Sequence, residues 1–173
     1  MLTAIVVLVL LVLVLVAASI TRVPPNTVAL VERLGKFQTA LQPGLAFRIP
    51  FVDKVAHRVS LQPMVLRMPK IPLANNEGTW VEIEPVIHFQ VIDAPKAVYE
   101  IANFHQGLEQ VATIAARQVV GTLDEYGALA GRGRIRTAIA EALVQPATAW
   151  GLRIAEVDVP SVERAKLPSA PTS

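Results

Sequence analysis

The sequence predicts an α+β protein with an N-terminal transmembrane helix, and three observations support this fold class. Residues 1–21 carry no charge, and positions 4–18 contain only Ala, Ile, Val and Leu. Residues 22–93 then show the alternation of apolar and polar side chains that is typical of strands. From residue 94 the apolar residues recur at helical spacing, and a strand pattern returns at 152–160.

The N-terminal segment is the first element. Twenty helical residues extend about 30 Å, which is the thickness of a bilayer core. A cleaved signal peptide is the alternative, because Ala17, Ala18 and Ser19 are small residues that suit a cleavage site. However, no Lys or Arg precedes Arg22, so the basic region of a signal peptide is missing. We therefore expect residues 1–21 to be an uncleaved, single-pass anchor in the cell membrane.

Charge is distributed unevenly along the rest of the chain. Residues 22–70 contain eight Lys/Arg and two acidic residues, a balance of +6, whereas residues 71–173 have eight Lys/Arg and twelve Asp/Glu, a balance of −4. The basic part follows the anchor directly, where anionic lipid head groups attract each basic residue by about 1 kcal/mol. Nucleic acid is not supported as a partner, because no recognition helix or aromatic RNA-binding motif accompanies the basic residues. Basic residues that flank the C-terminal end of the anchor favour a cytoplasmic folded part.

Two turns divide the first predicted strands from one another. Residues 28–35 form a short strand that closes in a turn at Gly35-Lys36, after Pro24 and Pro25 have stopped the anchor helix. "QPGL" (42–45) is a second turn. Residues 54–62 alternate, and this alternation places His57 on the apolar face as a packed structural histidine.

The stretch "GLAFRIPFVDK" (44–54) combines features that do not suit an ordinary strand. Phe47, Ile49 and Phe51 occupy alternate positions, but Pro50 removes a donor from any strand ladder. Residues 79–93 form the clearest strand, and Pro85 in its middle predicts a bulged or two-part strand at a sheet edge.

Helical patterns follow. Asp93 caps a short helix at 94–101, and a longer helix at 104–121 ends at Gly121. Thr122 and Glu125 have the spacing of a capping box. The helix that they begin is weakened by three glycines, and its continuation over 134–151 is kinked or broken by Pro146. We therefore divide the chain into an anchor (1–21), a β-rich part (22–93), an α/β part (94–160) and a short tail (161–173).

Four segments carry a resemblance to a known family. They are "ALVERLGKF", "LQPGLAFRIPFVDKVAHRVSLQ", "VIDAPKAVYEIANFHQGLEQVATIAARQVVGTLDE" and "AWGLRIAEVDVP". Together they resemble the stomatin/prohibitin/flotillin (SPFH, or Band 7) superfamily, and within it the bacterial stomatin-like proteins called paraslipins. The resemblance covers about residues 22–160. It implies an SPFH domain with a curved antiparallel sheet and packed helices. The family's long C-terminal coiled-coil helix is not expected here, since the chain ends in "LPSAPTS".

The resemblance also implies a function and a site. Family members are membrane scaffolds that oligomerise, organise lipid microdomains and associate with membrane proteases. In the family the first part of the domain lies against the bilayer and its loops enter the lipid. Phe47, Ile49 and Phe51 would then enter the interface, while the basic side chains stay with the head groups; these are Arg22, Arg48 and Lys54. The alternative is that the three apolar residues fill the domain core.

Catalytic chemistry is not indicated by the sequence. The chain has no cysteine, which excludes disulfides, thiolate metal sites and cysteine catalysis, and its three histidines are scattered. None of the plausible hydroxyls (Ser60, Thr79, Thr122 and Ser161) lies in a nucleophile elbow, and no phosphate-binding loop is present. We expect no enzyme activity, metal or cofactor. The alternative function is a membrane-tethered accessory hydrolase or protease cofactor with an unrecognised site.

Overall fold

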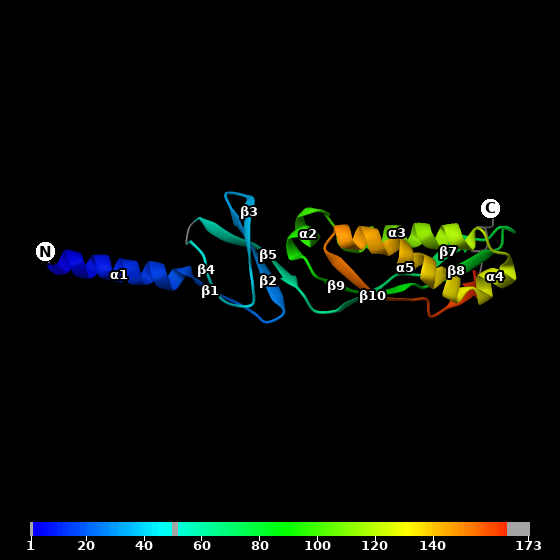
Figure 1. The fold of residues 1–173 in the computed structure, drawn as a ribbon, viewed down its shortest axis with the longest axis horizontal. Coiled ribbons are helices and arrows are strands. Elements are labelled where there is room, and N and C mark those ends of the chain that lie inside the picture. Colours follow the sequence, from blue (N-terminus) through cyan, green and yellow to red (C-terminus); the bar gives the residue numbers. More distant parts are fainter. Residues whose placement is uncertain (1, 50–51, 166–173) are drawn as a thin grey trace, which may run out of the picture. The chain divides into compact units, whose positions relative to one another are not determined.

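The computed structural model describes residues 2–49 and 52–165 (Figure 1). The chain packs as two compact units, Met1–Gln62 and Pro63–Ser173. This division falls between the fifth and sixth strands, whereas the sequence led us to divide the folded part at residue 93. The difference arises because strands from 64 to 91 pair with each other and with a strand after residue 151.

The first unit begins with α1 (Leu2–Ser19), which confirms the predicted helix. The helix ends at Ser19 and the next residues form a strand, so Pro24 and Pro25 are not what stops it, contrary to our expectation. Within the described part of the chain, no helix is long and apolar enough to cross a membrane.

In the described residues of the first unit, five strands follow α1. β1 (Ile20–Val23) pairs antiparallel with β4 (Gly44–Phe47) in a two-stranded ribbon. β2 (Thr27–Arg33) lies between β3 (Lys36–Leu41) and β5 (Asp53–Ser60), also antiparallel. Because β2 is the central strand, its residues 28–31 are all buried and form the core of this unit.

Two details of this sheet differ from the prediction. The turn between β2 and β3 consists of Leu34 and Gly35, one residue earlier than expected. His57 is not packed in the core: its side chain is half exposed and its Nε2 lies 4.0 Å from Glu32 Oε1. The alternation fails because the β2–β5 register shifts beside Ala56, and such a bulge changes the face on which the following residues point.

The part of the second unit that the structure describes, residues 63–165, contains six strands in two antiparallel sheets. In one sheet β9 (Val86–Val91) lies between β6 (Met64–Arg67) and β10 (Leu152–Asp158). In the other, β8 (Trp80–Ile83) lies between β7 (Ile71–Ala74) and β11 (Val162–Arg164). The two-part strand around Pro85 is confirmed, but its edge position is wrong, since β8 and β9 are both central. Pro85 sits between the two strands, where it removes no ladder donor, and its carbonyl accepts a hydrogen bond from Met68 N at 3.0 Å.

The described residues of the second unit also form four helices. They are α2 (Ala94–Tyr99), α3 (Phe104–Val120), α4 (Glu125–Ala130) and α5 (Arg132–Ala149). Asp93 caps α2 as predicted, accepting a hydrogen bond from Lys96 N. α3 and α5 lie side by side, and α5 also packs on β10 (Figure 1). The buried side chains of these long helices include Leu108, Ile135, Ile139 and Leu143.

The cap of α4 and the continuity of α5 differ from the expectations. Thr122 does not cap α4; its hydroxyl donates to Val119 O at 2.8 Å, and Asp124 caps the helix by accepting from Gly127 N at 2.7 Å. Of the two outcomes expected at Pro146, the break is wrong, because α5 continues to Ala149, and the kink stays a prediction. Leu143, three residues before this proline, and Ala147, directly after it, are buried, so packing holds the last turn in place.

Candidate membrane-contact site

The carboxylate of Asp53 organises the segment that connects β4 with β5. One oxygen accepts a hydrogen bond from Arg33 Nε and the other from the backbone N–H of Ile49, both at 2.8 Å. The backbone N–H of Asp53 donates to Ile49 O at 3.0 Å, and Arg48 Nη1 donates to Asp53 O at 3.2 Å. Asp53 is therefore the centre of a network that joins the start of β5, the end of β2 and the connecting loop.

This network fixes the charge state of Asp53. The hydrogen bond from Arg33 lowers the pKa of the Asp53 carboxyl, and the N–H of Ile49 lowers it further. The same hydrogen bond raises the pKa of Arg33. Asp53 is 8% exposed. The Asp53 carboxylate is thus ionised and largely buried, and it links β2 to the loop. Its negative charge neutralises the positive charge of Arg33.

The apolar side chains of the predicted site project away from the core. Phe47 is 72% exposed and Ile49 is 51% exposed. Phe47 lies opposite Ile20 across the β1–β4 ribbon, and Leu45 lies opposite Arg22 on the same face. Ile20 and Leu45 are exposed as well. One face of the ribbon therefore presents apolar side chains next to a basic one. Phe51 lies outside the described residues.

The loop is joined to the end of α1. The backbone N–H of Arg48 donates to Ser19 O at 2.9 Å. An open hollow of about 480 Å³ lies at this junction, lined by Ser19, Arg33, Gln38, Thr39, Phe47, Arg48, Ile49 and Asp53. The exposed apolar residues are thus held directly beside the point where the apolar helix ends.

The three basic residues of the predicted site differ in position. Arg22 and Lys54 are exposed, on β1 and β5. Arg48 is half-buried and turns back to the carbonyl of Asp53, and its Nε is buried without a hydrogen-bond partner among the described residues. The described structure thus leaves Arg22 and Lys54 accessible to an anionic partner, while Arg48 supports the loop.

Leu34 is the residue of this region that the sequence reasoning missed. It is 92% exposed and occupies the tip of the β2–β3 hairpin, directly after Arg33. The available signal was a leucine before a glycine at a hairpin turn, a position where Asn or Asp is usual.

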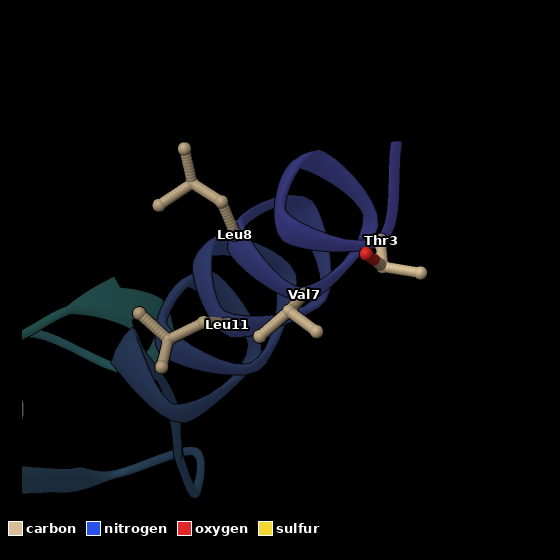
Figure 2. Close-up of a pocket in the computed structure, with 4 residues that line it drawn as sticks. All are labelled: Thr3, Val7, Leu8 and Leu11. Carbon is tan, nitrogen blue, oxygen red and sulfur yellow. The ribbon is translucent and has the colours of Figure 1, made fainter. Parts of the chain in front are cut away.

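The N-terminal helix itself presents apolar side chains on its surface. Figure 2 shows Thr3, Val7, Leu8 and Leu11, which line a shallow groove of about 480 Å³ along α1. The exposed fraction of Val7 is 64% and that of Leu8 is 61%. Hydrocarbon side chains at this density are unfavourable in water, so a surface of this kind requires an apolar covering.

A metal centre finds no support in the described residues, which contain no group of three or more His, Asp or Glu side chains placed to hold an ion. Ser60 and Thr122, two of the hydroxyls weighed above, make local hydrogen bonds. Ser60 Oγ accepts from Gln62 N, and Thr122 Oγ1 donates to a helix carbonyl.

Comparison with known proteins identifies relatives over most of the chain. Residues 21–168 match the model of the SPFH domain / Band 7 family. An uncharacterized protein of Mycobacterium tuberculosis is 34% identical over 157 residues, which cover 91% of this chain and 41% of that protein. An uncharacterized protein of Methanothermobacter thermautotrophicus is 33% identical over 159 residues, or 92% of this chain and 49% of that protein.

A named relative is human stomatin-like protein 2, mitochondrial, which is 26% identical over 140 residues that cover 81% of this chain and 39% of that protein. The chain spans less than half the length of these curated relatives. The family match covers both folded units and agrees with their antiparallel sheets and packed helices. The chain therefore belongs to the SPFH domain / Band 7 family.

Proposed function

We propose that this protein is a membrane-bound scaffold without enzyme activity, anchored through residues 1–21 and assembled laterally with copies of itself. The observation that carries the proposal is the apolar surface that runs from α1 to the neighbouring ribbon and loop. Exposed side chains on α1 are followed by Ile20, Phe47 and Ile49, all exposed and joined through the Arg48–Ser19 hydrogen bond. A lipid interface supplies the apolar covering that this surface needs.

Charge supports lipid as the covering. Arg22 and Lys54 are exposed beside this surface, and residues 22–70 carry a balance of +6 from eight basic and two acidic residues. Anionic head groups lie at the depth where such side chains would remain while the apolar residues enter the interface. We accordingly assign the partner as a bilayer that contains anionic lipid, with the folded units on its cytoplasmic side.

Lateral assembly and a partner protease are further parts of the proposal. The outer strands β3 and β5 flank the sheet of the first unit, and an outer strand has backbone groups that can pair with another chain. Named relatives are stomatin-like proteins. We propose that the assembled scaffold restrains or presents membrane proteins, with membrane proteases as the first class to test.

The experiment uses the full chain expressed in bacterial cells. Membranes are washed with high salt and with alkaline carbonate, and the protein is then extracted in mild detergent and imaged by electron microscopy. We expect retention through both washes and closed or regular assemblies in the images. Recovery in the soluble fraction as a chain that begins near Thr21 would show instead that residues 1–21 are a cleaved signal peptide. Protein that stays in the membrane but is monomeric would contradict the proposed lateral assembly and leave the proposed membrane anchor intact.

A further inference from the structure

We infer that Thr137, on α5, is a phosphorylation site for a protein kinase that recognises arginine, and that Arg134 pairs with the phosphate once it is in place. The inference concerns the second unit alone and goes beyond the proposed scaffold function, so its failure would leave that function intact. It starts from three arginines near the beginning of α5 that the fold does not fully explain.

The arginines stand five, three and one residues before Thr137; they are Arg132, Arg134 and Arg136. Arg132 donates to the carbonyl of Pro160 at 2.6 Å, which accounts for its presence. The other two are exposed, and neither pairs with an acidic side chain within the residues that the structure describes. Positive charge at the start of a helix opposes the helix dipole, and α5 has no acidic residue in its first turn to offset it. The charges of Arg134 and Arg136 therefore suit an acidic partner outside the fold.

The charge of the surrounding chain sets this cluster apart. Residues 71–173 have eight basic and twelve acidic residues, a balance of −4, so three arginines within five positions are not a general feature of the surface. Guanidinium groups bind carboxylates in a bidentate manner. Protein kinases use such charge pairing to select substrates with basic residues close to the acceptor hydroxyl. The spacing of the arginines before Thr137 fits this mode of selection.

The hydroxyl of Thr137 is available, unlike those of the other threonines in the helices of this unit. Thr113 and Thr148 each donate to the carbonyl four residues earlier, at 2.7 Å. Thr137 is exposed, and its hydroxyl makes no hydrogen bond within the described part of the chain. It can therefore enter a reaction without first giving up a hydrogen bond in the fold.

The reaction requires a nucleoside triphosphate as the phosphoryl donor. Thr137 Oγ1 attacks the γ-phosphorus of Mg-ATP, and the hydroxyl proton passes to the aspartate of the kinase catalytic loop. The bond from the γ-phosphorus to the bridging oxygen breaks, and ADP leaves.

A kinase cleft must reach the segment in a locally opened form, and the start of α5 is weakly held. The helix begins at Gly131 without a side-chain cap, and Gly133 weakens its first turn. Opening as far as Thr137 withdraws one fully buried side chain, that of Ile135. Such limited openings occur in a folded chain without global unfolding.

The folded structure has room for the phosphate. An open hollow of about 370 Å³ has Gly133, Arg134, Thr137 and Glu141 in its lining. A Cβ added to Gly133 would meet no atom within 4 Å, so the turn before Thr137 is open. Residues three and four positions apart are neighbours on a helix, which places Arg134 on one side of the phosphate and Glu141 on the other. The phosphate is thus attracted toward Arg134 and repelled by Glu141.

The test uses the full chain in mild detergent, with radiolabelled Mg-ATP and a kinase that requires arginine five and three residues before its acceptor. The modified position is assigned by mass spectrometry. We expect one phosphate, on Thr137, and none in Thr137→Val. Arg134→Gln should lower the initial rate by about tenfold or more, because one charge-assisted contact with the kinase is lost. Arg153→Gln is the matched control, an exposed arginine of β10 that should not affect the rate.

The melting temperature of each variant shows whether it is folded before the rates are compared. No phosphate on Thr137, or an unchanged rate in Arg134→Gln, would overturn the inference. Phosphorylation that occurs only after heat unfolding would overturn it too, because the site would then be closed in the folded chain. Phosphate should also be present on Thr137 in protein purified from the cells that produce it naturally, and its absence there would contradict a native site.

A second measurement tests the pairing with Arg134. Charge-assisted hydrogen bonds favour the doubly charged phosphate, so its second pKa should be lower in the folded chain than in the chain unfolded by urea. A ³¹P titration of the phosphorylated protein follows both states. Equal pKa values would show that the phosphate is free in water and would contradict the pairing.

Discussion

Arg33 and Asp53 form an ion pair at 2.8 Å between the last residue of β2 and the first residue of β5. The pair closes the end of the sheet at which the hairpin tip and the β4–β5 loop meet. It is distinct from the other ion pairs described, because its carboxylate is largely buried and also holds a backbone N–H. A charge-assisted pair of this kind ties loop geometry to protonation, which makes it testable by pH.

Acid should weaken the first unit through Asp53. The pKa of this carboxyl is lowered by Arg33 and by the N–H of Ile49, so it lies below its unfolded value of about 3.9. The stabilisation is fully present above that unfolded value and is lost as the pH falls through the folded one. The melting temperature, followed by circular dichroism from neutral pH to acid, should fall in this window. The control variant Asp53→Asn should melt lower at neutral pH and show a smaller fall; parallel curves would contradict this role.

Replacing Phe47 and Ile49 together by Ser should weaken vesicle binding and barely change the melting temperature. Each large side chain that lipid withdraws from water contributes about 1.5–3 kcal/mol to binding. A core role predicts the reverse, a loss of several kcal/mol in stability. Flotation with vesicles is measured on a chain that begins at Ile20, which removes α1 and keeps the β1–β4 pairing intact. A matched loss of stability would assign the two residues to the core.

The same shortened chain should bind anionic vesicles in a salt-dependent way. Screening lengths fall from about 10 Å at 0.1 M salt to about 3 Å at 1 M, so attraction between exposed lysines or arginines and lipid head groups weakens. The double variant Arg22→Gln, Lys54→Gln should bind less at low salt and lose less on salt addition. Binding to neutral vesicles that equals binding to anionic ones at every salt concentration would rule out the electrostatic contribution.

Two glycine-to-alanine substitutions in the second unit should have opposite effects. Gly151 has φ +69°, and a methyl group there would meet the carbonyl oxygen of Asp93 and lie 2.8 Å from its Cβ. Gly151→Ala should therefore destabilise the unit by about 1–3 kcal/mol. Gly133 lies in α5 with no atom within 4 Å of an added Cβ, so Gly133→Ala should stabilise by about 0.5 kcal/mol. Denaturant unfolding measures both, and equal effects would show that the close approach at Gly151 relaxes easily.

Local sequence patterns were enough to predict several helices and strands. The uncharged apolar segment predicts α1, and Asp93 predicts the start of α2, since an N-cap depends on residues within one turn. The spacing of Leu108, Ala112 and Ala115 predicts the buried side of α3. Alternation around Pro85 predicts the buried residues of β8 and β9, including Ile83 and Phe89. In each case neighbours in sequence carry the information.

The formation of the short strands and the choice of the residue that caps α4 could not be predicted from local sequence, because they depend on residues that are distant in the chain. β1, β6, β7 and β11 have three or four residues each, too few for a period, and exist because partner strands supply their hydrogen bonds. Thr122 and Asp124 are both suitable N-cap residues for α4, and in the folded chain Asp124 is the one that caps the helix. The N–H of Glu125 is bound by Glu77, which is remote in sequence.

The sequence by itself determined the apolar helix, the basic region that follows it and the SPFH resemblance. It also singled out Phe47 and Ile49, but it left open whether they contact lipid or fill the core. The tertiary structure decided that Leu34 lies at the same end of the sheet as these residues, and that Arg48 turns inward while Lys54 stays exposed. The physical reason is register. Which residue of β2 faces Asp53 depends on a bulge in the β2–β5 pairing, and no local period records where a bulge falls.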